Sequence, residues 1–259
     1  MWNLEALSDK QILRCLNTIS SHTFYMLVGD ALDAKKSLSV VRMADGEKAL
    51  MDICGDHPDS EPIDPKSIPI GWPEGWLDRF GVADIPKNLL KERIIRAAEE
   101  ADFFAASLAG IQLPEFNVDH FSERSVWVDN FFPNAWDETM KENLFKKAGH
   151  VLLLHRNLHL ADSMQIRSHF VLKVRVTYLK LDNWKDADSV IKKANKIDAP
   201  LVLFSAGPAS KYIGPAIATG GNIPKVTLDI GQAMDRWTFL PLKEKADRIR
   251  KINPRPDIK

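Results

Sequence analysis

The chain has 259 residues, of which 45% are hydrophobic and 27% are charged, and its formal net charge is zero. This composition is that of an ordinary globular protein and excludes a disordered or collagen-like chain. The two cysteines, Cys15 and Cys54, are too few for a disulfide framework or a cysteine-ligated zinc site, so we expect both to be buried. We find no signal peptide and no apolar run long enough to span a membrane, and we therefore expect a cytoplasmic protein.

The first half of the chain predicts three helices, one strand and one long loop. Apolar residues at helical spacing indicate a helix within residues 4–31, with Ser8 as its N-cap. A short buried strand over residues 39–43 ends in an acidic turn. The remaining helices are expected over residues 48–53 and 86–100. Between them, five prolines in residues 55–73 predict a loop of the length typical of lids and binding segments.

The second half alternates between apolar strands and helices. Strands are expected within residues 102–107, 125–128, 150–154, 171–179, 200–205 and 225–229, and helices over 136–147, 187–195 and 212–219. Apolar strands separated by helices are typical of a largely parallel sheet covered on both faces. We therefore predict a Rossmann-like α/β fold, with a single domain over residues 1–242 and a basic tail over residues 243–259.

An acidic tripeptide, Asp45-Gly46-Glu47, follows the first expected strand. Two carboxylates one residue apart can both face a divalent cation where the intervening residue permits an irregular turn, and glycine does so. Mn²⁺ or Mg²⁺ held there would neutralise the charge on a leaving diphosphate, and Arg42 would add a bidentate phosphate contact. Taken alone, the tripeptide also fits an ordinary exposed acidic turn.

Two later strands also end in segments that suit a ligand. Gly207-Pro208-Ala209-Ser210-Lys211 joins an apolar strand to a helix, and backbone N–H groups at such a junction can bind an anion. The alternative is a tight connection chosen for packing. Asp229-Ile230-Gly231, with Asp235 a few residues on, follows the last strand. Asp229 or Asp235 would act as general base or help to hold a metal, while the alternative for Asp229 is a turn or capping residue.

Three segments in this order, VVRMADGE, LFSAGPASKYIGPAIA and VTLDIGQAMDRW, resemble those of the GT-D fold glycosyltransferases. The resemblance spans roughly residues 36–237. It implies transfer of a sugar from a nucleoside diphosphate sugar, which we expect to be a UDP-sugar, with a divalent cation that is often manganese. It also implies that Asp45 and Glu47 hold the metal. The sequence departs from the family at Gln232, where the family has histidine, and at Asp235, which stands one residue later than in the family.

Further candidates follow other strands. Asp129 and Asn130 end one strand beside Trp127 and Phe131, which we expect to pack in the core. Asp182, Asn183 and Trp184 would recognise a nucleobase, or else cap a helix. The residues expected to bind the donor are therefore Arg42, Gly46, Gly207, Pro208, Ser210, Arg156, Asn183 and Trp184.

Together these features predict a metal-dependent glycosyltransferase in which Asp45, Glu47 and either Asp235 or Asp129 carry the chemistry. The expected acceptor is a hydroxyl of a glycan or glycoprotein, or of a hydroxymethylated pyrimidine in viral DNA. In the DNA version, Trp72 and Trp76 of the long loop would assist base flipping. The alternative is a catalytically inactive nucleotide or nucleic-acid binding module on the same fold.

Overall fold

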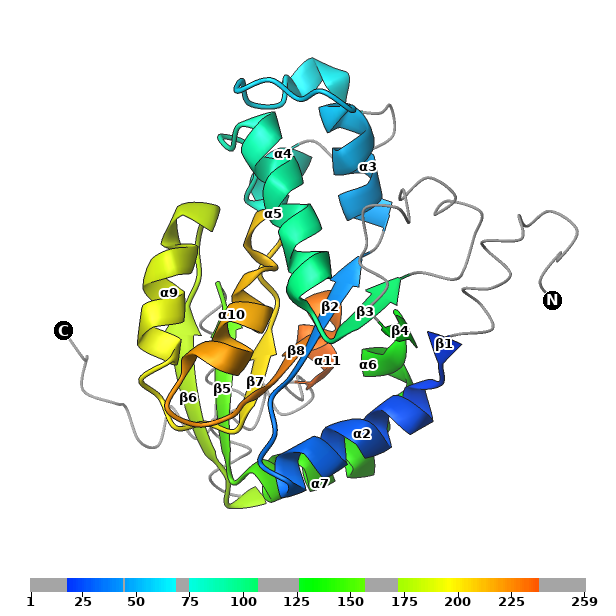
Figure 1. Ribbon diagram of the computed structural model, residues 1–259, viewed down its shortest axis with the longest axis vertical. Helices are drawn as coiled ribbons and strands as arrows, with labels where there is room; N and C mark the ends of the chain where they lie inside the picture. The colour runs from blue at the N-terminus through cyan, green and yellow to red at the C-terminus, as the bar shows by residue number, and fades with distance from the viewer. Residues whose placement is uncertain (1–17, 44, 69–74, 107–125, 157–171, 238–259) are drawn as a thin grey trace, which may run out of the picture.

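The computed structural model describes residues 18–43, 45–68, 75–106, 126–156 and 172–237. Eight strands in these ranges form one parallel sheet in the order β1-β4-β3-β2-β8-β7-β5-β6 (Figure 1). The strands are β1 (Thr18–Ile19), β2 (Leu38–Met43), β3 (Phe103–Ala106), β4 (Val126–Asp129), β5 (His150–His155), β6 (Arg175–Lys180), β7 (Leu201–Phe204) and β8 (Val226–Asp229). The predicted Rossmann-like α/β fold is therefore confirmed.

Helices cover both faces of the sheet. One face carries α3 (Asp45–Cys54), α4 (Trp76–Phe80), α5 (Lys87–Glu100), α9 (Ala187–Ala194) and α10 (Ile213–Gly220). The other carries α2 (Ser21–Asp33), α6 (Phe132–Ala135), α7 (Glu138–Ala148) and α11 (Met234–Trp237). Short 3-10 turns are η2 (Pro65–Ser67), η5 (Trp184–Asp186), η6 (Pro208–Ser210) and η7 (Gly231–Ala233). Figure 1 shows α3 and α4 beyond the ends of β2 and β3, at the carboxyl edge of the sheet.

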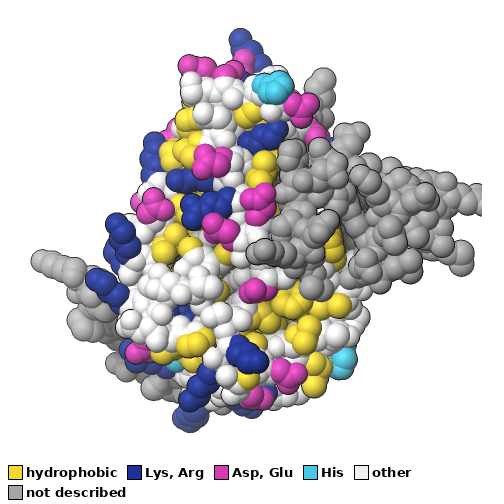
Figure 2. Space-filling model, in the orientation of Figure 1, with side chains coloured by type: hydrophobic (Ala, Val, Ile, Leu, Met, Phe, Trp, Pro, Cys, Tyr) yellow, Lys and Arg dark blue, Asp and Glu magenta, His cyan; other side chains and the backbone are white. Residues whose placement is uncertain are grey.

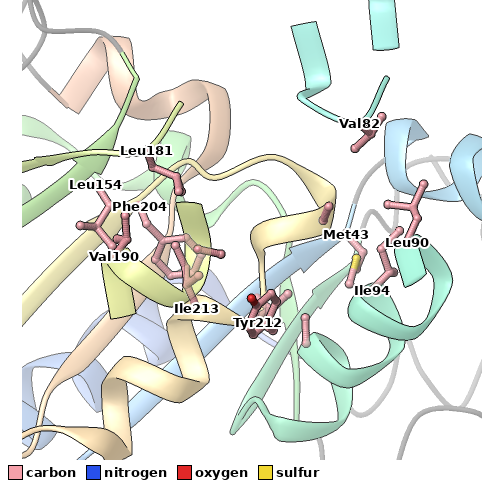
Figure 3. Close-up of a cluster of buried hydrophobic side chains, with 14 of the residues drawn as sticks. Met43, Val82, Leu90, Ile94, Leu154, Leu181, Val190, Phe204, Tyr212 and Ile213 are labelled. Atoms are coloured by element: carbon pink, nitrogen blue, oxygen red, sulfur yellow. The ribbon is translucent and has the colours of Figure 1, made fainter. Parts of the chain in front are cut away.

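Two buried clusters divide between the two faces because successive side chains of a strand point to opposite sides. In β2, Val41 and Met43 belong to the first cluster, whereas Val40 belongs to the second. Figure 3 shows part of the first cluster, where Met43 of the sheet meets Leu90 and Ile94 of α5. All residues of β7 and β8 are buried, which confirms that the central strands are covered on both faces.

The N-terminal helix is shorter than the sequence predicts. The helix predicted within residues 4–31 is wrong at Thr18–Ile19, which forms the edge strand β1 and pairs with β4. The Ser20 side chain accepts a hydrogen bond from the Thr23 amide and so starts α2 at Ser21. The proposed cap at Ser8 lies outside the described residues.

One further expectation needs correction near the long loop. Trp76 is 2% exposed within the first core cluster, so it is not available to assist base flipping. The other candidate, Trp72, lies outside the described ranges. Cys54 is buried as expected, and burial raises the pKa of its thiol to about 11. None of the described helices is both long and apolar enough to cross a membrane.

Candidate functional site

Arg42 ties together the ends of three strands. Its backbone amide donates to Asp229 Oδ2 at 3.1 Å, across from β2 to β8. Its Nε donates to the carbonyl and the side-chain oxygen of Asn130, each at 2.9 Å, and Nη1 donates to the Ile230 carbonyl at 2.8 Å. Burial lowers the pKa of Arg42, and the carboxylates of Asp229, Glu47 and Asp129 oppose that shift. Guanidinium groups stay protonated in proteins, so Arg42 remains a cation here.

Lys211 lies between two buried carboxylates. Its Nζ is 2.6 Å from Asp229 Oδ2 and 3.2 Å from Glu47 Oε1. All three residues are buried, with exposed fractions of 6% for Lys211, 1% for Asp229 and 6% for Glu47. Burial alone would lower the pKa of Lys211, but the two carboxylates outweigh it and raise the pKa above its ordinary value. Together with the half-buried Arg42, these three residues form a group of two cations and two anions, which we call the strand-end cluster.

Glycine is required at position 231 by this arrangement. Gly231 has a φ of +47°, and a Cβ there would lie 2.7 Å from Arg42 Nη1. Its amide donates to Asp229 Oδ1 at 3.1 Å, so the turn after β8 closes on the carboxylate that it follows. The turn alternative for Asp229 is therefore confirmed, and its role as a general base or metal ligand stays a prediction.

The turn after β7 delivers Lys211. Gly207 has a φ of +68°, in the left-handed region, and Pro208 then begins η6. Ser210 and Lys211 follow as buried residues, and α10 begins at Ile213. The short turn thus directs the ammonium group of Lys211 toward β8 rather than toward solvent.

The acidic tripeptide has a different conformation from the one predicted. Asp45, Gly46 and Glu47 form the first turn of α3 instead of an irregular turn. In an α-helix, residues two apart project about 200° from each other, so the helix does not by itself bring the two carboxylates together. Glu47 reaches the strand-end cluster, Gly46 is buried, and the side chain of Asp45 lies outside the described part of the structure.

Asp129 and Asn130 end β4 close to Arg42. Asn130 is 3% exposed and fixes the guanidinium group, a role that strand-end position alone did not indicate. Asp129 Oδ1 accepts from the Phe131 amide at 2.9 Å, and Oδ2 accepts from Ser21 Oγ at 3.3 Å. The expectation that Phe131 packs in the core is wrong, because its side chain is 47% exposed. Trp127 does pack, edge-on against Phe104.

The other predicted donor-binding residues follow β5 and β6. Arg156 is exposed, and its Nη2 lies 3.4 Å from where a Cβ of Gly81 would be, at the end of α4. Asn183 caps η5 through its side-chain oxygen, so the capping alternative is confirmed for that residue.

Trp184 links η5 to the segment before α5. Its Nε1 donates to Asp84 Oδ1 at 2.7 Å, and the Arg93 guanidinium lies 5.0 Å from the centre of its ring. These contacts hold Trp184 against the α5 side of the molecule. The backbone of Asp235 lies in α11, while its side chain, like that of Gln232, is outside the described set.

The fit of a metal ion depends on Glu47. Carboxylate oxygens are the ligands that Mg²⁺ and Mn²⁺ prefer. The described side chains contain no group of three or more histidine, cysteine, aspartate or glutamate residues placed to hold a metal. Glu47 supplies one carboxylate at the carboxyl edge of the sheet, and its partner there is the ammonium group of Lys211. Glu47 can therefore serve as a metal ligand when the cation replaces Lys211 as the partner of its carboxylate.

A parallel sheet whose central strand ends carry a polar cluster is typical of the Rossmann-like class, which binds ligands at the carboxyl ends of its strands. Residues 134–237 match the family model described as a GT-D fold-like domain, which confirms the resemblance to GT-D fold proteins over that range. The match covers less than half of the chain; it includes Lys211 and Asp229 but not Arg42 or Glu47. No curated protein and no solved structure matches the chain.

Proposed function

We propose that this protein is a metal-dependent glycosyltransferase that moves a sugar from a nucleoside diphosphate sugar to a hydroxyl acceptor. The observation that carries the proposal is the strand-end cluster, because it gathers Arg42, Glu47, Lys211 and Asp229 at the carboxyl ends of the central strands. Part of this cluster lies within the GT-D fold-like region, a fold related to glycosyltransferases. Fold alone does not set the activity, so the site has to support it.

Arg42 supplies donors for a diphosphate in this proposal. Its hydrogen bonds within the described part of the chain use the amide, Nε and Nη1, which leaves Nη2 for a phosphate oxygen. The bonds to Asn130 and Ile230 hold the guanidinium plane fixed before any ligand binds. A preorganised donor loses little conformational entropy on binding and is therefore more effective than a mobile one.

Asp45 and Glu47 are the proposed ligands of Mn²⁺ or Mg²⁺, which requires the first turn of α3 to rearrange so that both carboxylates face the ion. A divalent cation bound there would neutralise the charge that develops on the leaving diphosphate. Lys211 keeps Asp229 as its partner at 2.6 Å when Glu47 turns to the metal, so no buried ammonium is left without a counter-charge. Gly207, Pro208 and Ser210 form the turn that holds Lys211 in place and would lie beside the donor. Asp129 or Asp235 would accept the proton of the acceptor hydroxyl.

The test compares nucleotide release from UDP-sugars, with and without MnCl₂, in the wild type and in Asp45→Asn and Glu47→Gln. We expect each substitution to lower turnover by at least about 100-fold, since a metal ligand contributes several kcal/mol to the transition state. Asp52→Asn is the matched control, because Asp52 is an exposed acid of the same helix paired with Lys48. Wild-type turnover in Glu47→Gln, or equal losses in Asp52→Asn, would refute the assignment.

One observation favours a second candidate, a module that binds nucleotide sugars without transferring the sugar. Glu47 is already neutralised by Lys211 at 3.2 Å, and a carboxylate held in this way needs no metal. The two candidates differ in one respect, since the module would bind a nucleotide sugar but release no nucleotide in the presence of any divalent cation.

A further inference from the structure

Phe131 is an exposed aromatic residue that follows the candidate-site residue Asn130 in the chain. It is one of three large hydrophobic residues that are exposed in the described part of the chain, with an exposed fraction of 47%. It directly follows Asn130, whose carbonyl accepts a hydrogen bond from Arg42 Nε. The backbone that carries the ring therefore lies next to the residue that fixes the Arg42 guanidinium group.

The backbone that carries this ring is fixed. The Phe131 amide donates to Asp129 Oδ1 at 2.9 Å. Its carbonyl accepts from the amides of Asn134 and Ala135, at 2.8 and 3.0 Å, as α6 begins. Three hydrogen bonds thus hold the position from which the exposed side chain projects.

A carboxylate and a hydroxyl lie at the backbone of Phe131. Asp129 is half-buried, and each of its oxygens accepts one hydrogen bond, from the Phe131 amide and from Ser21 Oγ. A carboxylate has about four acceptor positions, so Asp129 can still accept from a ligand hydroxyl. Ser21 begins α2, which brings a second polar group to the same place.

The helices α2 and α6 carry no cation of their own for a phosphate backbone. Neither α2 nor α6 contains a lysine or arginine, and the charged group nearest to Phe131 in the sequence is Asp129. Figure 2 shows hydrophobic side chains gathered on the face that carries α2 in Figure 1, with acidic and basic side chains around them. Nucleic acids bind through lysine and arginine contacts to phosphates, so a neutral ligand suits this surface better than DNA.

We infer that Phe131 is the stacking platform for a neutral sugar ring of the acceptor, with the Asp129 carboxylate receiving a hydroxyl of that ring. Sugars present an apolar face of C–H groups to an aromatic ring and hydroxyls at their edge, which matches an exposed phenyl group on a residue whose amide binds a carboxylate. The inference rests on the proposed glycosyltransferase function and deepens it, because it selects a carbohydrate over a DNA base as the acceptor.

The test is saturation-transfer NMR with the methyl α- and β-glycosides of glucose, galactose, mannose and N-acetylglucosamine. We expect at least one glycoside to bind the wild type at millimolar concentration, with the strongest saturation on the C–H protons of one ring face. Phe131→Ala should weaken binding roughly tenfold and Phe131→Leu by less, while Phe131→Trp should keep it. Met26→Ala is the matched control, since Met26 is 50% exposed on α2. Thermal unfolding verifies that each variant is folded.

The outcomes separate this inference from the proposed function. Wild-type glycoside binding in Phe131→Ala, no binding of any glycoside to the wild type, or an equal loss in Met26→Ala overturns the platform. So does a hydroxymethylcytosine duplex that binds through Phe131 where the glycosides do not. Binding that is lost in Phe131→Ala supports the platform even if no UDP-sugar is turned over, in which case the proposed transferase function alone fails. If UDP-sugars are turned over but the acceptor KM is unchanged in Phe131→Ala, the platform alone fails.

Discussion

Replacing Lys211 with methionine tests whether the strand-end cluster is held by its central cation. Methionine keeps the length and apolar character of the side chain but leaves Asp229 and Glu47 without the ammonium group at 2.6 and 3.2 Å. At an effective dielectric constant of about 20, these distances correspond to attractions of about 6 and 5 kcal/mol. The desolvation of each ion, several kcal/mol, offsets much of that gain.

Lys211→Met should lower the free energy of unfolding by about 3–5 kcal/mol at neutral pH, which is the usual range when one partner of a buried ion pair is removed. This is a large part of the roughly 5–15 kcal/mol that stabilises a typical domain, so the loss is readily measured by urea unfolding. The double variant Lys211→Met, Asp229→Asn should lose less than the sum of its single changes, because it removes one of the stranded charges.

Lys141→Met is the matched control. Lys141 is 5% exposed, but its partner Glu138 lies 3.4 Å away with a side chain that is 56% exposed. Removing an ion pair with a solvated partner should change the free energy of unfolding by less than about 1 kcal/mol. If Lys211→Met loses no more stability than Lys141→Met, the cluster is not held by Lys211 and the account of the site is refuted.

Two further substitutions test the geometry around the cluster. Gly231→Ala should lower the free energy of unfolding in urea by more than Gly55→Ala does. Both positions have a positive φ, which costs alanine about 1–2 kcal/mol. Of the two, only Gly231 would bring the new Cβ against another group, Arg42 Nη1 at 2.7 Å. Equal costs would contradict the close approach. Tyr212→Phe removes the 2.7 Å hydrogen bond to Asp188 and should therefore lower the free energy of unfolding by about 1 kcal/mol at neutral pH. Burial raises the pKa of Tyr212 from 10.0 to about 12, so its stabilising contribution is complete below pH 10 and is lost as the pH rises through 12. The stability difference between wild type and Tyr212→Phe should therefore narrow across that window, and a constant difference would contradict the raised pKa.

The sheet and most helices were predictable because their signals are local. Leu201–Phe204 is an apolar run, Val226–Asp229 alternates apolar and polar residues, and all residues of both strands are buried. The strand Thr18–Ile19 was missed because two residues carry no periodicity, and its pairing with β4 joins segments more than 100 residues apart. The start of α3 was misplaced because Asp-Gly predicts a turn, whereas the structure continues the helix through both residues.

The candidate site was predictable in position but not in its contacts. Asp229 and Gly207 end parallel strands, and such ends meet at one edge of the sheet. That Lys211 would lie between Glu47 and Asp229 depends on three separate turns, which spacing along the chain does not encode. The exposure of Phe131 was missed for a similar reason, since an aromatic residue after a strand is more often buried than exposed.

The most direct test of the central claim is a thermal-shift screen of the wild-type protein with UDP-sugars and other nucleoside diphosphate sugars, with and without Mn²⁺. A ligand that binds the folded state stabilises it by about 2.7 kcal/mol at 100 times its Kd, a clear rise in Tm. We predict that at least one nucleotide sugar raises the Tm, more so with Mn²⁺, and that Glu47→Gln removes the metal-dependent part. If no nucleotide sugar shifts the Tm with or without the metal, the strand-end cluster is not a donor site and the proposed function is wrong.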